Sequence, residues 1–301
     1  MITALTGKYS ILINSDNLPV YLQPWYLDVV CGVNKWTVIE LLNTNNTVDA
    51  IWVSNTSKKM GLSYDLQAQL TPYSGLHVLE NNVSHTNIKK LLSYVKGEYR
   101  FISADLHYDN NQYFTELTAR RTTYIIPSNS QDVAWQSMKS DYRRKIKKAK
   151  VLYAVKEISF DKFWHLLATS FTLKNKPNPF PRALTEQLFK ACLKNKSLIL
   201  LGAFDSEDQL VGVASFLKDN IYTFYMGGGN IDKDNSMYLL LWQGIEQCMK
   251  DGLSFDFEGS SIPSIAQFFK GFGGNKKYYI HFTHYQNRLV KGLVGIKTKW
   301  L

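Results

Sequence analysis

Two carboxylates stand two residues apart in an apolar run near the end of the 301-residue chain, Phe255-Asp-Phe-Glu-Gly-Ser260. In a strand over 253–259, alternation would place Asp256 and Glu258 on one face and the phenylalanines on the other. Burial raises the pKa of such a carboxyl group and suits it to general-base catalysis. Glu258 is the stronger candidate, because open α/β sheets bind ligands at the carboxyl ends of their strands. The alternative is an exposed sheet face, or carboxylates bonded to nearby backbone N–H groups.

A glycine run, Tyr225-Met-Gly-Gly-Gly-Asn230, joins an expected strand to a long helix. Glycines let the backbone approach a ligand, and the following helix N-terminus favours a phosphate or carboxylate. The alternative is a turn that needs glycine only for its dihedral angles. The residues expected to bind the ligand are Met226, Gly227, Gly228, Gly229, Asn230, Lys233 and Ser236.

Two further segments are candidates for substrate contacts. Ser261 precedes Ile262-Pro263, so it either caps a helix or offers its hydroxyl to a ligand, and Ser260 before it is expected to contact a substrate. The proline-rich loop 176–181 lies between two expected helices. We expect it to contact an acceptor, with Phe180 as its aromatic residue.

The basic charge of the chain is concentrated in residues 139–150, KSDYRRKIKKAK, which hold seven lysines and arginines and one aspartate. The whole chain has a net charge of +10, which makes an anionic partner the first suspect. This helix face is either solvated or binds phosphate. Aromatic residues are sparse in it, so a small phosphorylated molecule is favoured over nucleic acid. The cations expected on the outer face are Arg143, Arg144, Lys147 and Lys150.

The composition excludes several classes of protein. With 45% hydrophobic and 20% charged residues, the chain is globular rather than disordered. It has no run of 18 apolar residues and no secretion signal at its start, so we expect a cytoplasmic protein without a transmembrane segment. The three cysteines, Cys31, Cys192 and Cys248, are expected to be small buried residues, and no metal site is indicated. The six histidines show no triad pattern.

The elements that must position these residues divide into two halves at the turn-rich loop 127–131. We therefore expect domains over 1–131 and 132–301. The first half predicts a helix within 18–32, a hairpin of strands 36–42 and 48–54, a helix over 87–95, and strands over 99–106 and 113–126.

The second half predicts three strands in hairpin order followed by a strand–helix–strand crossover, which makes a mixed α/β sheet. The expected helices span 132–150, 160–171, 183–195, 235–250 and 263–270. The expected strands span 198–204, 209–217, 221–226, 253–259 and 277–285.

Three motifs in this order resemble the acyl-CoA N-acyltransferase (GNAT-like) fold, and within it the FemABX group of bacterial aminoacyltransferases: DYRRKIKKAK, YMGGGN and FDFEGSSIPSIAQFFKGFGG. The resemblance covers most of 132–285, and over 1–131 it rests on element order and on YLQPWYLDVV. It implies two tandem GNAT-like domains, the first degenerate and the second carrying the acyl-transfer site.

The resemblance also implies where the reaction takes place. The acyl donor would lie where strands 221–226 and 253–259 splay apart, with its carbonyl bonded to backbone near Met226–Asn230 and its phosphates at the following helix N-terminus. Glu258 would face the acceptor amine.

The identity of the donor stays open between acyl-CoA and aminoacyl-tRNA. CoA-using members carry glycines in the turn after the first of these strands, where this chain has Ser236 and Tyr238. The long helical hairpin of some aminoacyl-tRNA-using members is absent from the sequence. The alternative function is a non-catalytic binder of an anionic nucleotide-sugar or nucleic acid on the same scaffold.

Overall fold

The computed structural model describes residues 1–301 except 60–61, 81–82, 115–118, 232–234, 261 and 298–301. The chain forms two compact units, 1–121 with 278–301 and 122–277. Both unit boundaries fall inside strands, β7 (Ala119–Ile126) and β13 (Asn275–Tyr285). The expected division at 131/132 therefore differs from the observed units, because the end of the chain returns to the first one.

The first unit is built on a sheet in the order β1-β2-β3-β4-β6-β13, with β5 paired to β3. The predicted hairpin is present, and Asn43 Oδ1 closes its turn by accepting from the N–H groups of Asn45 and Thr47. The strands are β1 (Ile2–Thr6), β2 (Trp36–Leu42), β3 (Val48–Lys59), β4 (Leu62–Leu66), β5 (Gly75–Val78) and β6 (Phe101–Leu106).

The longest helix of the first unit, α2 (His85–Glu98), covers this sheet with an apolar stripe. Ser84 caps it, and the buried residues are the four that the helical spacing predicts: Ile88, Leu91, Leu92 and Val95. The other helices are α1 (Pro24–Val30), α9 (Arg288–Lys297) and the short 3-10 helices η1 (Ser15–Asn17), η2 (Val20–Leu22) and η3 (Tyr108–Tyr113).

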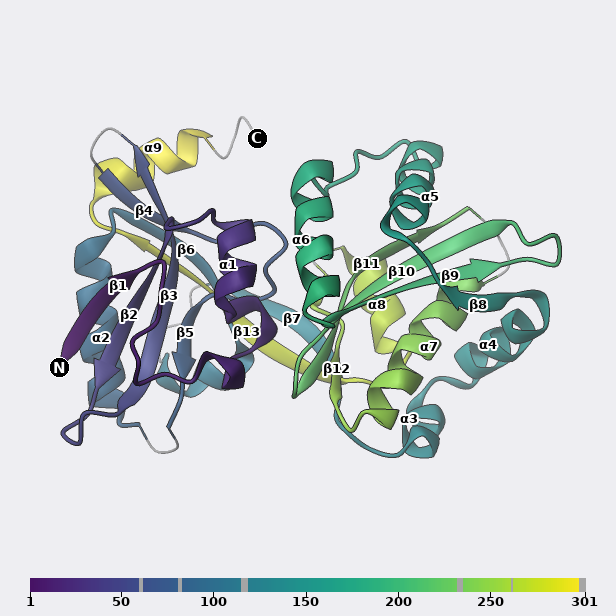
Figure 1. The fold of residues 1–301 in the computed structure, drawn as a ribbon, viewed down its shortest axis with the longest axis horizontal. Coiled ribbons are helices and arrows are strands. Elements are labelled where there is room, and N and C mark those ends of the chain that lie inside the picture. The colour runs from purple at the N-terminus through teal and green to yellow at the C-terminus, as the bar shows by residue number, and fades with distance from the viewer. Residues whose placement is uncertain (60–61, 81–82, 115–118, 232–234, 261, 298–301) are drawn as a thin grey trace. The chain divides into compact units, whose positions relative to one another are not determined.

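The second unit has the expected mixed sheet, in the order β7-β12-β11-β10-β9-β8. β9, β10 and β11 form the antiparallel meander, and β11 pairs in parallel with β12. Figure 1 shows α5 and α6 on one face of the sheet and α7 on the other. The strands are β8 (Ala154–Glu157), β9 (Leu198–Phe204), β10 (Leu210–Lys218), β11 (Tyr222–Asn230) and β12 (Ser254–Asp256).

The single helix expected over 132–150 is two helices, α3 (Gln131–Ser137) and α4 (Ser140–Leu152). The chain is extended at Met138, and the Lys139 N–H donates to Gly271 O at 3.0 Å. This tertiary bond ends α3 where the local sequence would continue it. The remaining helices are α5 (Phe160–Leu173), α6 (Arg182–Lys194), α7 (Ser236–Lys250) and α8 (Pro263–Lys270).

The core of the second unit is rich in aromatic rings from α4, α7, α8 and β12. The ring centroids of Tyr142 and Tyr238 lie 4.8 Å apart in an edge-to-face arrangement. Those of Phe257 and Phe269 lie 4.8 Å apart in a stacked arrangement. Cys192 and Cys248 are buried and Cys31 is half-buried, all three as free thiols. In the described part of the chain, no helix is long and apolar enough to cross a membrane.

Candidate active site

Two neighbouring parallel strands of the second unit separate, as the resemblance to the GNAT-like fold implies. The register of β11 and β12 covers three pairs and ends at Phe224 and Asp256. β12 stops there, whereas β11 continues to Asn230, paired with β10. The second half of β11 therefore has a main-chain edge that β12 does not cover.

The glycine run lies inside β11 and not in a turn, so that part of the prediction is wrong. The register with β10 shifts between Ser215, opposite Gly227, and Phe216, opposite Tyr225. Met226 is the extra residue of this β-bulge, which bends the strand. The bulge comes directly after the last pair with β12.

The main chain of β11 alternates between β10 and the uncovered edge. Ile231 N donates to Val211 O at 2.9 Å, so Gly227, Gly229 and Ile231 face β10. Gly228 and Asn230 then face the other way. Their N–H and C=O groups are the ones that a ligand in the strand separation could bond.

The main-chain groups of Asn230 already form hydrogen bonds within the protein. Ser170 of α5, which is 2% exposed, donates to Asn230 O at 2.9 Å and accepts from Asn230 N at 3.2 Å. Gly228 is thus the best candidate among the predicted residues for binding a ligand through its main chain. Sequence reasoning missed Ser170, although a serine on the apolar stripe of a helix was a usable signal.

The glycines have steric reasons for their positions. A Cβ on Gly227, whose φ is +150°, would lie 2.8 Å from the Phe180 ring. A Cβ on Gly229 would lie 2.9 Å from Ser170. A Cβ on Gly228 would collide with Val213 O of β10 at 2.4 Å and would also meet Tyr225 Oη and Met237 Cε at 3.0 and 3.1 Å. The structure therefore brings the predicted substrate residue Phe180, which is half-buried, onto the bulged part of β11.

The N-terminus of α7 follows β11, and it contributes differently from the prediction. Ser236 is fully buried with its Oγ against Gly212, so its side chain is not on a ligand-facing surface. Asn235 before it has a left-handed backbone, with φ of 72°. Lys233 lies outside the described residues.

Glu258 lies beyond the strand, because β12 ends at Asp256 and not near Gly259. Its backbone is left-handed, with φ of 55°, and so is that of Gly259. A side chain on Gly259 would collide with Thr122 O of β7, at 2.0 Å. The expected alternation of Asp256 and Glu258 along one strand face is therefore wrong: the chain turns between them.

The two carboxylates have different surroundings. Asp256 is fully buried, and its Oδ1 accepts from Thr123 Oγ1 at 2.6 Å and from the Glu258 N–H at 2.7 Å. It holds the turn that positions Glu258, and nothing in these contacts gives it a direct catalytic role.

Glu258 is half-buried as a residue, and its Oε1 is buried without a hydrogen-bond partner. Burial, followed by the nearby Asp256 carboxylate, raises the pKa of Glu258 well above its usual range. An unsatisfied buried acceptor with a raised pKa is the property expected of a group that exchanges a proton with a bound ligand.

Ser260 Oγ accepts from the Ile262 N–H at 3.1 Å, a local bond just before α8, whose N-cap residue is Ile262 and has no side-chain cap. Ser261 lies outside the described residues.

The basic side chains of helix α4 fall into two groups, those bonded within the protein and those exposed to solvent. Arg143 Nη1 donates to the carbonyl oxygens of Trp135, Gln136 and Met138 at 3.4, 2.9 and 2.5 Å. It therefore satisfies the carboxyl end of α3, and its assignment to the outer, substrate-binding face is wrong.

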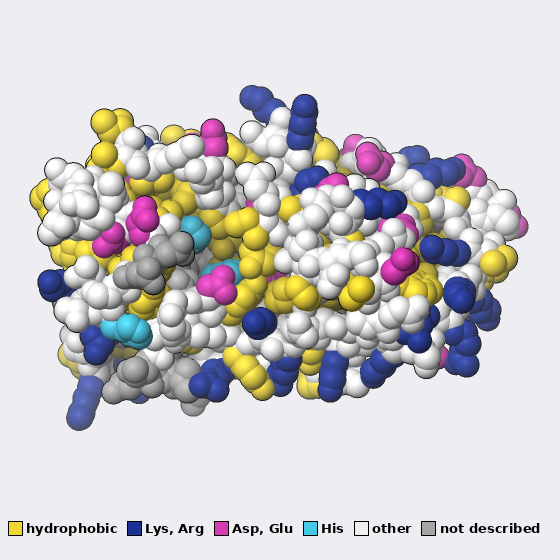
Figure 2. All heavy atoms as spheres, turned by 90° about the horizontal axis from the view of Figure 1, so that it is seen from below, with side chains coloured by type: hydrophobic (Ala, Val, Ile, Leu, Met, Phe, Trp, Pro, Cys, Tyr) yellow, Lys and Arg dark blue, Asp and Glu magenta, His cyan; other side chains and the backbone are white. Residues whose placement is uncertain are grey.

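Arg144 and Lys147 are exposed, and Arg144 pairs with Asp141 at 2.6 Å. On the other side of α4, Ile146 and Ala149 are buried as predicted. Figure 2 shows Lys and Arg side chains gathered on the part of the second unit where α4 lies.

Comparison with known proteins agrees with this architecture. Residues 136–270 match the family model of the acetyltransferase (GNAT) domain. No curated protein sequence matches the chain.

Solved structures extend the likeness to most of the chain. FemX superposes with a TM-score of 0.65 at 11% identity, covering 85% of this chain and 89% of FemX. A tandem GNAT protein from the clavulanic acid biosynthesis pathway superposes with a TM-score of 0.50 at 10% identity, covering 95% and 98%. A conserved protein of unknown function from Bacteroides thetaiotaomicron superposes with a TM-score of 0.54 at 9% identity, covering 86% of this chain and 90% of that protein.

The chain has a FemABX-like GNAT fold, with two tandem GNAT-like domains of mixed α/β structure. At these identities the likeness to solved structures establishes the fold alone, so the activity has to be argued from the site.

Proposed function

We propose that this chain is an N-acyltransferase or aminoacyltransferase, in which an amine directly attacks the carbonyl carbon of an activated acyl donor. The observation that carries the proposal is the separation of β11 from β12 beyond Phe224 and Asp256, which leaves the main chain of Gly228 facing the gap. The GNAT domain match over 136–270 spans these strands and α7.

In the proposed reaction, the Gly228 N–H donates to the donor carbonyl and stabilises the oxyanion that forms during attack. The new bond joins the amine nitrogen to the acyl carbon, and the bond from that carbon to the leaving sulfur or oxygen breaks. Glu258 takes the amine proton, directly or through water, and the leaving group is protonated in turn. Phe180 and the exposed cations Arg144 and Lys147 are the proposed contacts for acceptor and phosphate groups.

The donor is tested by titrating acetyl-CoA and an aminoacyl-tRNA into the full chain and assaying transfer to a panel of primary amines. The proposal expects saturable binding of one donor and an amide product detected by mass spectrometry. Binding of neither donor would overturn it.

The exposed cations of α4 support a second candidate, a non-catalytic binder of an anionic nucleotide-sugar or nucleic acid. Such binding would weaken steeply with added salt and would occur without acyl transfer. Salt-insensitive binding accompanied by amide formation would exclude it.

A further inference from the structure

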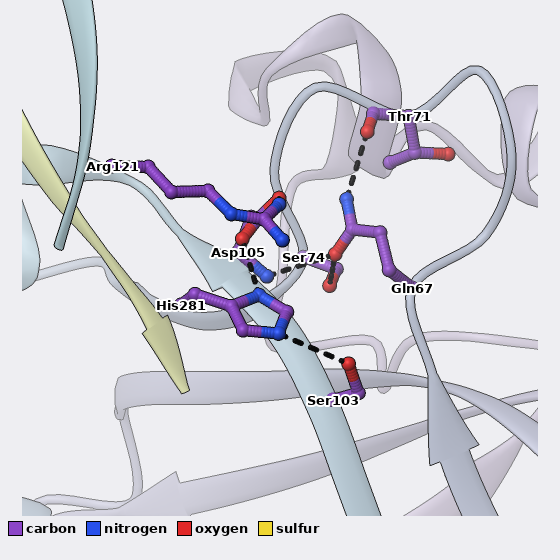
Figure 3. A network of polar contacts seen from close by, with 7 residues as sticks. All are labelled: Gln67, Thr71, Ser74, Ser103, Asp105, Arg121 and His281. Carbon is purple, nitrogen blue, oxygen red and sulfur yellow. Dashed lines mark hydrogen bonds and ion pairs between the residues drawn. The ribbon is translucent and has the colours of Figure 1, made fainter. Parts of the chain in front are cut away.

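A second cluster of chemically active side chains lies in the first unit, on the neighbouring strands β6 and β13 (Figure 3). Ser103 and Asp105 are two residues apart on β6, and His281 of β13 is the register partner of Asp105. His281 Nδ1 lies 2.7 Å from Asp105 Oδ1, and His281 Nε2 lies 3.4 Å from Ser103 Oγ. The imidazole therefore stands between a hydroxyl and a carboxylate.

These contacts determine which nitrogen of the imidazole ring carries the proton. An ionised carboxylate only accepts hydrogen bonds, so the nitrogen that faces Asp105, Nδ1, carries the proton. Nε2 then presents its lone pair to the Ser103 hydroxyl and can accept its proton. A serine–imidazole distance of 3.4 Å is longer than a productive contact, as is common before a substrate binds.

The three residues of the cluster differ in burial, and further hydrogen bonds fix Asp105. The side chains of Asp105 and His281 are 11% and 19% exposed, and Ser103 is half-buried. Arg121 Nη1 bonds Asp105 Oδ2 at 2.5 Å, and the Asp105 N–H donates to Gln67 Oε1 at 3.0 Å. The carboxylate is thus fixed, while Ser103 and His281 as residues keep partial exposure to solvent.

We propose that Ser103 is a nucleophile that accepts acyl groups from activated esters or thioesters, with His281 as its base and Asp105 as the residue that positions His281. Ser103 Oγ attacks the acyl carbon and its proton passes to His281 Nε2. The bond from that carbon to the ester oxygen or thioester sulfur breaks, and the leaving group takes the proton from His281. Water or an alcohol then releases the acyl group. This site is independent of the function proposed for the second unit.

The test is covalent labelling of the full chain with a fluorophosphonate, together with acyl-enzyme formation from p-nitrophenyl acetate, followed by peptide mass spectrometry. We expect one modified residue, Ser103, and no labelling of Ser103→Ala. His281→Gln should lower the labelling rate at least about 100-fold, because glutamine cannot act as the base.

Matched controls separate chemistry from folding. His284→Gln changes the other histidine of β13, and Ser206→Ala removes an exposed hydroxyl of the second unit, so both should label like the wild type. Arg121→Gln removes the ion pair that fixes the Asp105 carboxylate, so it should label more slowly than His284→Gln.

Asp105→Asn should label slowly and Asp105→Glu should recover part of the rate, as expected of a positioning residue. Thermal unfolding of each variant verifies the fold. Labelling confined to other residues, or an unchanged rate in folded His281→Gln, would overturn the proposal.

Discussion

The backbone N–H of Glu258 donates a hydrogen bond to Oδ1 of Asp256 at 2.7 Å. One carboxylate thereby fixes the left-handed backbone that presents the other. The two acidic residues are not an equivalent pair, because Asp256 is bonded and buried whereas Glu258 keeps an unpartnered buried oxygen. The proposed acyl-transfer site depends on this division between a positioning group and a proton-accepting group.

The Thr123 hydroxyl stabilises this turn, so Thr123→Val should destabilise the protein. It leaves a buried carboxylate oxygen with one partner fewer, which costs about 1–3 kcal/mol in the free energy of unfolding. Urea denaturation measures the change. The control is Thr172→Val on exposed α5 surface, expected within about 0.5 kcal/mol of the wild type. Equal stability of the two variants would contradict the role given to Thr123.

Glu258→Gln should make stability less dependent on pH. Folding favours the protonated form of Glu258, so its ionisation costs stability as the pH rises above the ordinary glutamate pKa of 4.5. The variant should match the wild type below that pH and be more stable than it at pH 8, as measured by urea denaturation at each pH. Glu207→Gln in the turn between β9 and β10 is the exposed control. A variant less stable than the wild type at pH 8 would refute the burial argument.

Gly227→Ala should destabilise the protein by about 1–3 kcal/mol, because its Cβ would press on Phe180 and its φ is unfavourable for alanine. Combining it with Phe180→Ala should remove the steric part, so that the double variant loses less than the sum of the single ones. Denaturant unfolding of the full double-mutant cycle measures this. Strict additivity would show that the two residues do not press on each other.

Substitution of two adjacent arginines of α4 should change stability to different extents. Arg143→Ala leaves three carbonyl oxygens at the end of α3 without their donor and should cost about 1–3 kcal/mol. Arg144→Ala removes one exposed ion pair and should change stability by less than about 1 kcal/mol. The midpoint of thermal unfolding compares them, and a larger loss for Arg144→Ala would contradict the structure.

Asp65 should make the first unit more stable in acid than at neutral pH. Burial raises its pKa from 3.8 to about 7, against the hydrogen bonds from Trp52 and Asn55 that favour its ionised form. Its contribution to the free energy of unfolding is greatest below pH 3.8 and is lost as the pH rises to about 7. The free energy of unfolding falls by about 4 kcal/mol over this range.

Asp65→Asn should flatten this part of the pH profile, measured as unfolding free energy between pH 4 and pH 8, while the exposed control Glu207→Gln should keep it. An unchanged profile in Asp65→Asn would show that another group is responsible.

Local patterns in the sequence predicted much of the secondary structure. Strands 36–42 and 198–204 and helix 263–270 have the bounds that alternation, helical spacing and turn residues indicate. The order of strands and helices in the second half also predicted the mixed sheet, because three hairpin strands and one crossover leave few arrangements. The separation of its parallel strands was expected only from the resemblance to the GNAT-like fold.

Contacts between distant residues could not be predicted in this way. The break between α3 and α4 depends on Gly271, more than a hundred residues later in the chain. The glycines of β11 make room for Phe180 and Ser170, which no local rule places there. The Ser103–His281–Asp105 cluster needs the register of β6 with β13, so spacing along the chain concealed it.

The central claim is that the main chain of Gly228 binds the acyl donor where β11 leaves β12. The most direct measurement is the amide ¹⁵N–¹H chemical shift of Gly228 during titration with acetyl-CoA or an aminoacyl-tRNA, with exposed Gly252 as the reference glycine. We predict a saturable shift of Gly228 that follows the binding isotherm, with Gly252 unmoved. Saturable donor binding that leaves Gly228 unshifted and perturbs another surface, such as α4, would contradict the account.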